Sequence, residues 1–319
     1  MRQRKQARGM ATVTVHALDA GHITIPERFF VIPNDPDARR TVPSLSFLIQ
    51  HKDASSGEVT RLVFDLGIRR DLNLYPPALK SHLDSRQPLS THPDVVSSLA
   101  SGGLSQEQID YVMFSHVHYD HVGLPKDFTG NNTKFIIGNG ALDLLNGKTK
   151  HDLGKHMVFE SDLLPLERTI ELPPPDSNGS ARFSWKPLAL FPHAIDFFGD
   201  GSVFILDAPG HLPGHINLLC RISERPTKFV CLAGDACHDV RLLSGERDIA
   251  TWTDEAGKVC CIHVDIPTTK ETLARLYAAT RNGIELDGED PASVEVIFAH
   301  DFAWEEDAKK NDRFWPGQL

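Results

Sequence analysis

The stretch Ser115-His116-Val117-His118-Tyr119-Asp120-His121 places three imidazoles and one carboxylate within six residues. It follows the apolar run Tyr111–Phe114, which is short, bounded by polar residues and typical of a buried strand. Clustered polar side chains beside such a strand are costly without a partner, and a bound metal ion removes that cost. Where the chain leaves the strand, His116 and His118 can point the same way, and Asp120 and His121 can serve an adjacent site. We therefore expect a metal site here, with a solvated polar loop as the alternative.

Three further candidate ligands each follow an expected strand. His211 lies in Pro209-Gly210-His211-Leu212-Pro213-Gly214-His215, after the run 202–206. Asp235 follows the run 228–232, and His300 follows the run 294–298. Because strands of one sheet hold their ends rigidly at a common edge, these side chains are expected to meet in one cleft.

Both halves of the chain show strand and helix patterns. Alternating β-branched and apolar residues predict an antiparallel start, and shorter apolar runs predict buried strands. The remaining expected strands are 12–16, 44–50, 61–64, 134–137 and 217–222, and the expected helices are 93–100, 105–110 and 268–280. Strands outnumber helices, which indicates an α/β or α+β protein.

The stretch 163–200 is irregular and is expected to be a long loop or flap. It contains Pro173-Pro174-Pro175 and Asn178-Gly179, which favour turns over regular structure. We expect its aromatic residues to pack against the domain, with a role in lining a substrate pocket as the alternative; they are Phe183, Trp185, Phe191, Phe197 and Phe198.

Composition narrows the classes of partner. The 319 residues are 40% hydrophobic, enough for a sizeable core, and carry a formal net charge of -10. A nucleic-acid-binding protein usually needs a basic face, so this charge argues against such a partner. Neutral or cationic substrates are easier to accommodate, and we expect a small-molecule substrate.

Cysteine usage and hydropathy indicate a cytoplasmic protein. The five cysteines are odd in number and show no Cys-x-x-Cys spacing, so a disulfide framework is not expected. No apolar run is long enough to span a bilayer, and no secretory signal precedes the domain. We expect residues 1–10 to form a basic, disordered arm and residues 11–319 to form one domain, as a monomer or homodimer.

Together these motifs resemble the signature of the metallo-β-lactamase superfamily. The matching pieces are HVHYDH at 116–121, PGHLPGH at 209–215, Gly234-Asp235 and Ala299-His300-Asp301, in the order the family has them. The resemblance implies a four-layer αβ/βα sandwich, in which two similar halves face each other and metal ions lie at the open edge between the sheets.

The resemblance also implies a ligand set for two divalent ions. His116, His118 and His211 would hold one ion, and Asp120, His121 and His300 would hold the other, with Asp235 bridging both. Nitrogen and oxygen ligands without thiolate favour zinc first, with manganese, iron or cobalt as alternatives.

Neighbouring polar residues are expected to have supporting roles. His215 would close its turn or stand behind the ligands, because the family's pattern favours His211 as the ligand. Asp65, in Phe64-Asp65-Leu66-Gly67, resembles an aspartate that supports the ligand loop. The other histidines are expected to be structural or surface residues: His16, His51, His82, His92, His151, His156 and His263.

Such a site predicts a hydrolase. Two adjacent ions can activate a bridging hydroxide and polarise a carbonyl, and the resemblance makes Asp120 the group that passes a proton to the leaving group. The chain looks most similar to the N-acyl-homoserine lactonase branch. That branch commonly has tyrosine three residues after the bridging aspartate, whereas this chain has His238. A different cyclic ester, or a cyclic amide such as a γ-lactam, is therefore expected as substrate, with His238 assisting its binding.

Three other functions remain open. Thioesterases of the glyoxalase II or polyketide-pathway type share every ligand. A mononuclear iron persulfide dioxygenase reuses three of them. A non-catalytic metal-binding module is the third alternative, although the complete second set of ligands argues against it.

Overall fold

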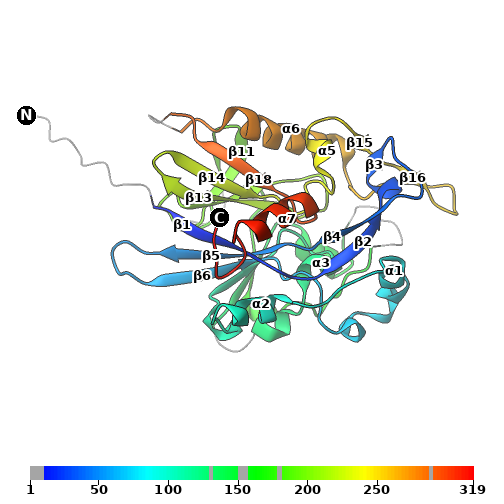
Figure 1. Cartoon of the computed structure of the whole chain (residues 1–319), viewed down its shortest axis with the longest axis horizontal. Coiled ribbons are helices and arrows are strands. Elements are labelled where there is room, and N and C mark those ends of the chain that lie inside the picture. The colour runs from blue at the N-terminus through cyan, green and yellow to red at the C-terminus, as the bar shows by residue number, and fades with distance from the viewer. Residues whose placement is uncertain (1–10, 129–131, 150–156, 178–181, 287–289) are drawn as a thin grey trace, which may run out of the picture.

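Two six-stranded β-sheets lie face to face in the computed structural model, which describes residues 11–128, 132–149, 157–177, 182–286 and 290–319 (Figure 1). The expected basic arm, His151 and His156 lie outside the described residues. The first sheet has the order β1 (Val13–Leu18), β5 (Ser46–Lys52), β6 (Val59–Phe64), β7 (Tyr111–Met113), β8 (Lys134–Ile137) and β9 (Thr169–Glu171). The second has the order β10 (Lys186–Leu188), β11 (Phe191–Asp196), β12 (Val203–Asp207), β13 (Ile216–Glu224), β14 (Thr227–Leu232) and β18 (Ser293–Ile297).

Each sheet combines antiparallel and parallel pairs. In the first sheet β1, β5 and β6 are antiparallel, and β6 through β9 run parallel. In the second sheet β10 through β14 are antiparallel, and β14 pairs with β18 in parallel. The expected antiparallel start is confirmed, and parallel strands follow it in the half that carries residues 116–121.

The strands alternate between two hydrophobic environments, as a period of two requires. Leu218 and Val230 face the first sheet in a core between the sheets, whereas Leu219 and Phe229 face outward. On the first sheet Leu48 likewise faces outward. Because both faces of both sheets are buried, each sheet needs a covering layer on its outer side.

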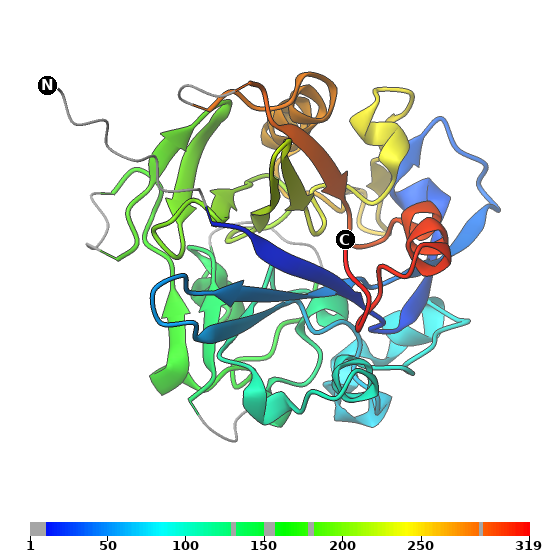
Figure 2. The ribbon, with the colours of Figure 1, turned by 60° about the vertical axis from the view of Figure 1, so that its left-hand side comes forward.

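Helices supply those outer layers (Figures 1 and 2). On the first sheet they are α2 (Val95–Ser101) and α4 (Ala141–Leu145), and on the second sheet the cover is α6 (Ile266–Asn282). The other α-helices are α1 (Lys80–Ser85), α3 (Tyr119–Val122), α5 (Val240–Leu243) and α7 (Phe302–Lys310). The order helix, sheet, sheet, helix confirms the expected four-layer αβ/βα sandwich.

The helix predictions hold with adjusted ends. α2 begins after Asp94, whose carboxylate accepts a hydrogen bond from the backbone N–H of Ser97 at 3.0 Å. The predicted helix 105–110 is one short 3-10 helix, Gln106–Gln108, and the Gln108 side chain accepts from the Ser105 N–H. α6 is longer than predicted because Asp265 caps its start.

The prediction that 163–200 is a loop or flap is wrong at three strands, β9, β10 and β11, and the described residues between them are irregular as expected. β9 extends the first sheet, and β10 and β11 form one edge of the second, so this stretch passes from one sheet to the other. Phe183 and Phe197 are buried between the sheets, and Phe191 is buried on the outer side of the second. Strands of three residues beside prolines carry too little alternation to be recognised from sequence.

Three short strand pairs lie outside the main sheets. Their members are β2 (His22–Pro26) with β4 (Arg39–Pro43), β3 (Val31–Ile32) with β15 (Asp248–Ile249), and β16 (Trp252–Thr253) with β17 (Val259–Cys260). Each of the last two pairs is only two residues long, and none of the three pairs was predicted. The β2–β4 pair matters for function because its residues line the cavity described below.

The expectation of free cysteines is confirmed, since Cys220, Cys231, Cys237, Cys260 and Cys261 form no disulfide. None of the helices in the described part of the chain combines the length and the apolar character needed to cross a bilayer.

Candidate metal centre

Turns after four strands bring the predicted site residues to one edge between the sheets. The HVHYDH segment follows β7 and enters α3, and His211 follows β12. Asp235 follows β14, and His300 follows β18. All seven predicted ligand side chains meet here, although they are scattered over much of the sequence.

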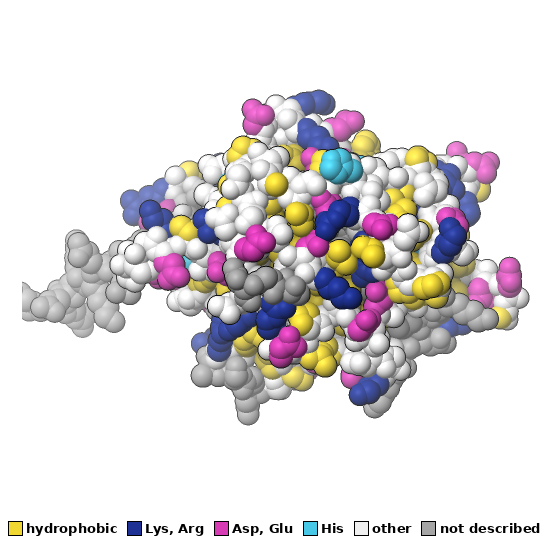
Figure 3. Space-filling model, turned by 90° about the horizontal axis from the view of Figure 1, so that it is seen from below, with side chains coloured by type: hydrophobic (Ala, Val, Ile, Leu, Met, Phe, Trp, Pro, Cys, Tyr) yellow, Lys and Arg dark blue, Asp and Glu magenta, His cyan; other side chains and the backbone are white. Residues whose placement is uncertain are grey.

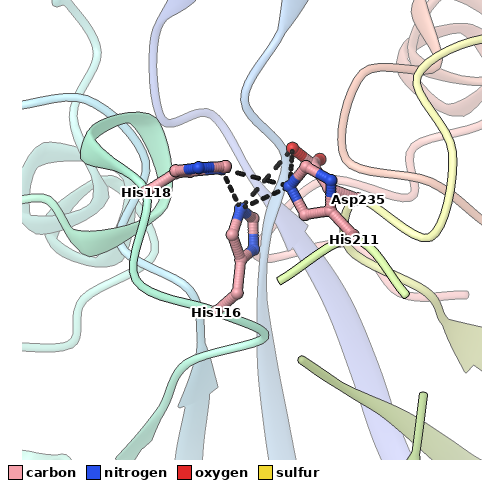
Figure 4. A group of neighbouring side chains, drawn as sticks. All are labelled: His116, His118, His211 and Asp235. Carbon is pink, nitrogen blue, oxygen red and sulfur yellow. Dashed lines mark hydrogen bonds and ion pairs between the residues drawn. The ribbon is translucent and has the colours of Figure 1, made fainter. Parts of the chain in front are cut away.

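His116, His118, His211 and Asp235 converge in one group (Figure 4). The Nε2 of His116 lies 2.9 Å from the Nδ1 of His118 and 3.3 Å from the Nε2 of His211. The His211 Nε2 lies 3.1 Å from the His118 Nδ1. Asp235 Oδ2 is 3.6 Å from His116 Nε2 and 3.7 Å from His211 Nε2.

Asp120, His121 and His300 form a second group on the other side of Asp235. His300 Nε2 lies 3.6 Å from Asp120 Oδ2. The other oxygen of Asp235, Oδ1, is 3.2 Å from His121 Nε2 and 3.3 Å from His300 Nε2. One carboxylate thus presents a different oxygen to each group.

The distances between these atoms, and the lack of hydrogen-bond partners at two of them, fit a bound metal ion. Four ligands at zinc's ordinary distance from nitrogen or oxygen are separated by about 3.3 Å when they are tetrahedral. The separations in the first group, 2.9 to 3.7 Å, bracket that value. In addition, His121 Nε2 and Asp235 Oδ1 are buried without a hydrogen-bond partner among the described residues. Such orphaned atoms facing one point are explained by a cation between them.

The outer nitrogens of three histidines are anchored, which fixes their rings. His300 Nδ1 donates to the carbonyl of Pro43 at 2.7 Å, and His121 Nδ1 donates to Asp65 Oδ2 at 2.9 Å. Ser115 Oγ donates to Asp65 and accepts from His116 Nδ1 at 3.0 Å. This is the arrangement that orients histidine ligands toward metal.

Asp65 supports the ligand loop, as expected from its place in the sequence. Its backbone has a φ of 62°, an uncommon value outside glycine, and this turns the carboxylate under Ser115. Oδ1 accepts from the backbone N–H of Ser115 at 2.7 Å. The Asp65 side chain therefore holds both the start of the HVHYDH segment and the ring of His121.

Electrostatics put His116, His211 and Asp235 in the protonation states that metal binding needs. Burial, with nearby histidines, holds the pKa of His116 and His211 well below the ordinary value, so both rings are neutral. Burial raises the pKa of Asp235, but His121, His238 and His300 outweigh it and hold that pKa well below the ordinary range. Asp235 is therefore ionised. For His121 and His300, burial lowers the pKa, but the charge of Asp235 outweighs it and holds both pKa values above the ordinary one.

His215 stands behind the centre. Its Nδ1 donates to the carbonyl of Ala208 at 3.0 Å, and its Nε2 accepts from the backbone N–H of Asp235 at 3.1 Å. Burial lowers its pKa to about 4, consistent with a neutral ring that donates at one nitrogen and accepts at the other. Both nitrogens are occupied by protein groups.

His238 lies closer to Asp235 than any of the predicted histidine ligands. Its Nε2 is 2.9 Å from Asp235 Oδ2, and its ring stacks 5.5 Å from that of His300. Its Nδ1 is buried and has no hydrogen-bond partner among the described residues.

His263 is a site residue that the sequence did not reveal. It was expected to be structural or on the surface, yet its buried ring lies 5.0 Å from that of His211 and 5.4 Å from that of His238. Neither of its nitrogens has a hydrogen-bond partner among the described residues. No motif surrounds it, so only the tertiary structure could find it.

A cavity opens onto the centre. One side carries His118, Asp120, Asp235, His238 and His300. The rest of its wall is mostly apolar and consists of Ile23, Ile25, Phe30, Leu79, Met157, Val158 and Ile262. Three further side chains in this wall are polar: His82, Arg86 and Tyr119. A mostly apolar wall with a few polar groups is typical of a site for a small organic molecule.

Comparison with known proteins agrees with this geometry. Residues 39–239 match the family described as "Metallo-beta-lactamase superfamily". A cytochrome P450 monooxygenase named mpaDE from Penicillium brevicompactum is 28% identical over 91% of this chain and 34% of its own length. The gamma-lactamase FDB1 from Fusarium pseudograminearum is 30% identical over 61% of this chain and 45% of its own. The chain thus spans about a third to a half of these two relatives.

A solved structure has the same fold. It is an N-acyl homoserine lactone hydrolase with N-hexanoyl-L-homoserine bound at its metal centre, and it superposes with a TM-score of 0.63 at 17% identity over 97% of this chain and 100% of that one. A family match covering more than half of the chain, together with this fold, is decisive: the protein belongs to the metallo-β-lactamase superfamily.

Proposed function

We propose that the protein is a dinuclear metal-dependent hydrolase that opens a small cyclic ester or cyclic amide. The observation that carries the proposal is the position of Asp235, whose Oδ2 faces His116 and His211 while its Oδ1 faces His121 and His300. A carboxylate between two groups of ligands is suited to hold two ions a short distance apart. Zinc fits this donor set first.

The ions would supply Lewis acidity, lowering the pKa of a water molecule and polarising the substrate carbonyl. The protein's own residues supply the rest. Asp120 lines the cavity and is 6% exposed, so its carboxylate can take a proton at one oxygen and deliver it to the leaving group. The apolar wall opposite excludes bulk water, which strengthens these charge interactions.

His238 is proposed to act on the substrate from beside the centre. Its Nε2 contacts Asp235, it lines the cavity, and its Nδ1 has no partner among the described residues. The unpartnered nitrogen can hydrogen-bond to a bound ring. The contact with Asp235 also favours a role in orienting that carboxylate, and the two roles are separable by experiment.

A cyclic ester or amide is favoured by the apolar lining of the cavity and by the relatives. The gamma-lactamase from Fusarium pseudograminearum, and a second from Gibberella moniliformis that is 30% identical over 56% of this chain, carry activity on cyclic amides in their names. A compact, largely apolar ring can pack against Phe30, Leu79 and Ile262 in the cavity wall.

The test compares metal-loaded wild type with His118→Ala and Asp235→Asn on a panel of lactones, lactams and thioesters. We expect ring opening by wild type, loss on chelation and recovery on adding zinc. Both variants should lose activity and bind less metal, while circular dichroism and thermal unfolding show that they remain folded. Full activity in either variant would contradict the dinuclear mechanism.

The same panel separates the alternatives. Preference for thioesters would indicate a thioesterase, oxygen consumption with iron would indicate a dioxygenase, and metal binding without turnover would indicate a non-catalytic module. For His238, the diagnostic variant is His238→Phe. A fall in kcat/KM with two metals retained supports substrate binding, loss of metal supports orientation of Asp235, and no change removes both roles.

A further inference from the structure

Arg86 is a buried cation in the wall of the cavity. It follows α1, only 9% of the residue is exposed, and it lines the cavity together with Asp120, His238 and the other side chains of the centre. Its position is fixed by the backbone, because its N–H donates to Leu83 and its carbonyl accepts from Thr24. These two backbone hydrogen bonds fix the point from which the Arg86 side chain extends into the cavity wall.

No carboxylate among the described residues pairs with Arg86. Its Nε lies 3.4 Å from the Nε2 of His82, and the guanidinium lies near the phenol of Tyr119 in the same wall. An imidazole and a phenol accept hydrogen bonds but bring no negative charge. The two carboxylates of the cavity, Asp120 and Asp235, face the histidines of the metal centre.

Arg69 shows how this fold treats a buried arginine that has only a structural role. It is 4% exposed and binds Glu160 with two nitrogens, at 2.7 and 3.1 Å. Burying a charge without a counter-ion is costly, and proteins retain it where a ligand supplies the opposite charge. Arg86 lacks the partner that Arg69 has.

Arg86 also lines a second pocket, which offers a route to the cavity. This pocket shares Phe30, His82, Arg86 and Ile262 with the cavity, and its other charged side chains are Arg28, Arg39 and Asp84. On the face that carries α1 and α2, basic and acidic side chains lie among hydrophobic ones (Figure 3). An apolar, negatively charged molecule can follow this route, although the whole chain carries a net charge of -10.

We infer that Arg86 binds a carboxylate on the substrate, so that the natural substrate is a small lactone or lactam carrying a second, non-reacting acid group. The inference rests on the proposed hydrolysis and deepens it by naming the substrate class. The planar guanidinium matches a carboxylate with two parallel hydrogen bonds. Pairing at Arg86 fixes the ring at one end while its carbonyl lies at the metal centre, which orients the scissile bond.

The test uses one bicyclic aryl lactone in three forms: unsubstituted, with a ring carboxylate, and as the methyl ester of that carboxylate. Each is measured with wild type, Arg86→Met, Arg86→Lys and the control Arg281→Met, an exposed arginine near the end of α6. For the carboxylate lactone we expect Arg86→Met to lower kcat/KM about 100-fold, mainly through KM, and Arg86→Lys to lower it less. The two neutral lactones should change less than about threefold, and Arg281→Met should resemble wild type.

Equal losses on charged and neutral lactones would overturn the inference, because they would show that Arg86 only supports the fold. Binding of benzoate, measured by calorimetry, keeps the result separate from catalysis. If wild type opens none of the lactones, the proposed function fails. In that case benzoate binding that Arg86→Met abolishes still supports the anion site, and binding that is absent or unaffected by the substitution overturns it.

Discussion

The Nε2 of His215 accepts a hydrogen bond from the backbone N–H of Asp235, 3.1 Å away, and so joins the PGHLPGH turn to the carboxylate between the two ligand groups. The other ring nitrogen holds the carbonyl of Ala208. His215 is close to His211 in sequence, but it holds Asp235 in position and does not face the centre.

This relationship predicts different effects for the two histidines of the turn. His215→Phe should keep both metals under saturating conditions but lower metal affinity and kcat/KM about 10- to 100-fold, as loss of a supporting partner usually does. His211→Phe should remove one ion even at saturation. Metal content measured by mass spectrometry during titration distinguishes them, and the reverse pattern would exchange their roles.

Asp65 gives a second prediction. Asp65→Asn keeps the shape of the side chain, but it cannot accept all three hydrogen bonds from Ser115 N, Ser115 Oγ and His121 Nδ1. We expect the ion held by His121 to be lost first, with about 10- to 100-fold weaker binding. Titration with a graded chelator measures this, and the exposed Asp143→Asn on α4 is the control. Unchanged affinity for both ions would show that Asp65 does not orient His121.

Asp207, at the end of β12, predicts a pH dependence of stability. Burial raises its pKa to about 6, although His193 nearby opposes the rise. The folded state therefore favours the protonated acid, and stability is lost as the pH rises from about 4 through 6. Asp207→Asn should remove this loss and stabilise the protein above that range by up to about 3 kcal/mol. Thermal unfolding across the range measures it.

The exposed Asp53 provides a contrast of opposite sign. Hydrogen bonds from Ser55 and Ser56 hold its pKa below the ordinary value, so its ionised form is favoured in the folded state. Asp53→Asn should therefore lower stability at neutral pH, with a difference that disappears in acid.

The prediction for Asp207 would be contradicted if Asp207→Asn gained no stability relative to wild type between acid and neutral pH. That result would show that burying a charged Asp207 is not costly.

The strand ends and the candidate ligands could be predicted from sequence, because each ligand directly follows an apolar run. Local information is enough when a side chain's place depends on the strand that carries it. The order of the motifs resembles that of the metallo-β-lactamase superfamily, and this resemblance predicted the fold. The structure confirms its four layers.

Arg86 and His263 could not be predicted. Neither lies in a motif, and each reaches the centre through packing between segments distant in sequence. The strands β9 to β11 were missed for a different reason, since their pairing with longer neighbours gives them a regularity that their own residues do not encode.

Gly234 gives the last prediction. It has a φ of 47°, and a Cβ there would lie 2.6 Å from the Cβ of Ser115, so the chain can bring Asp235 beside the HVHYDH segment only because no side chain intervenes. Gly57 has a φ of 74° and nothing within 4 Å, which makes it a matched control for the backbone alone. Gly57→Ala should cost about 1 kcal/mol and leave metal binding unchanged. Gly234→Ala should cost about 3 kcal/mol and weaken binding of both ions, because the clash adds to the strain and displaces the carboxylate between them. Denaturant unfolding and metal titration measure the two effects, and equal behaviour of the variants would show that the close approach to Ser115 does not position Asp235.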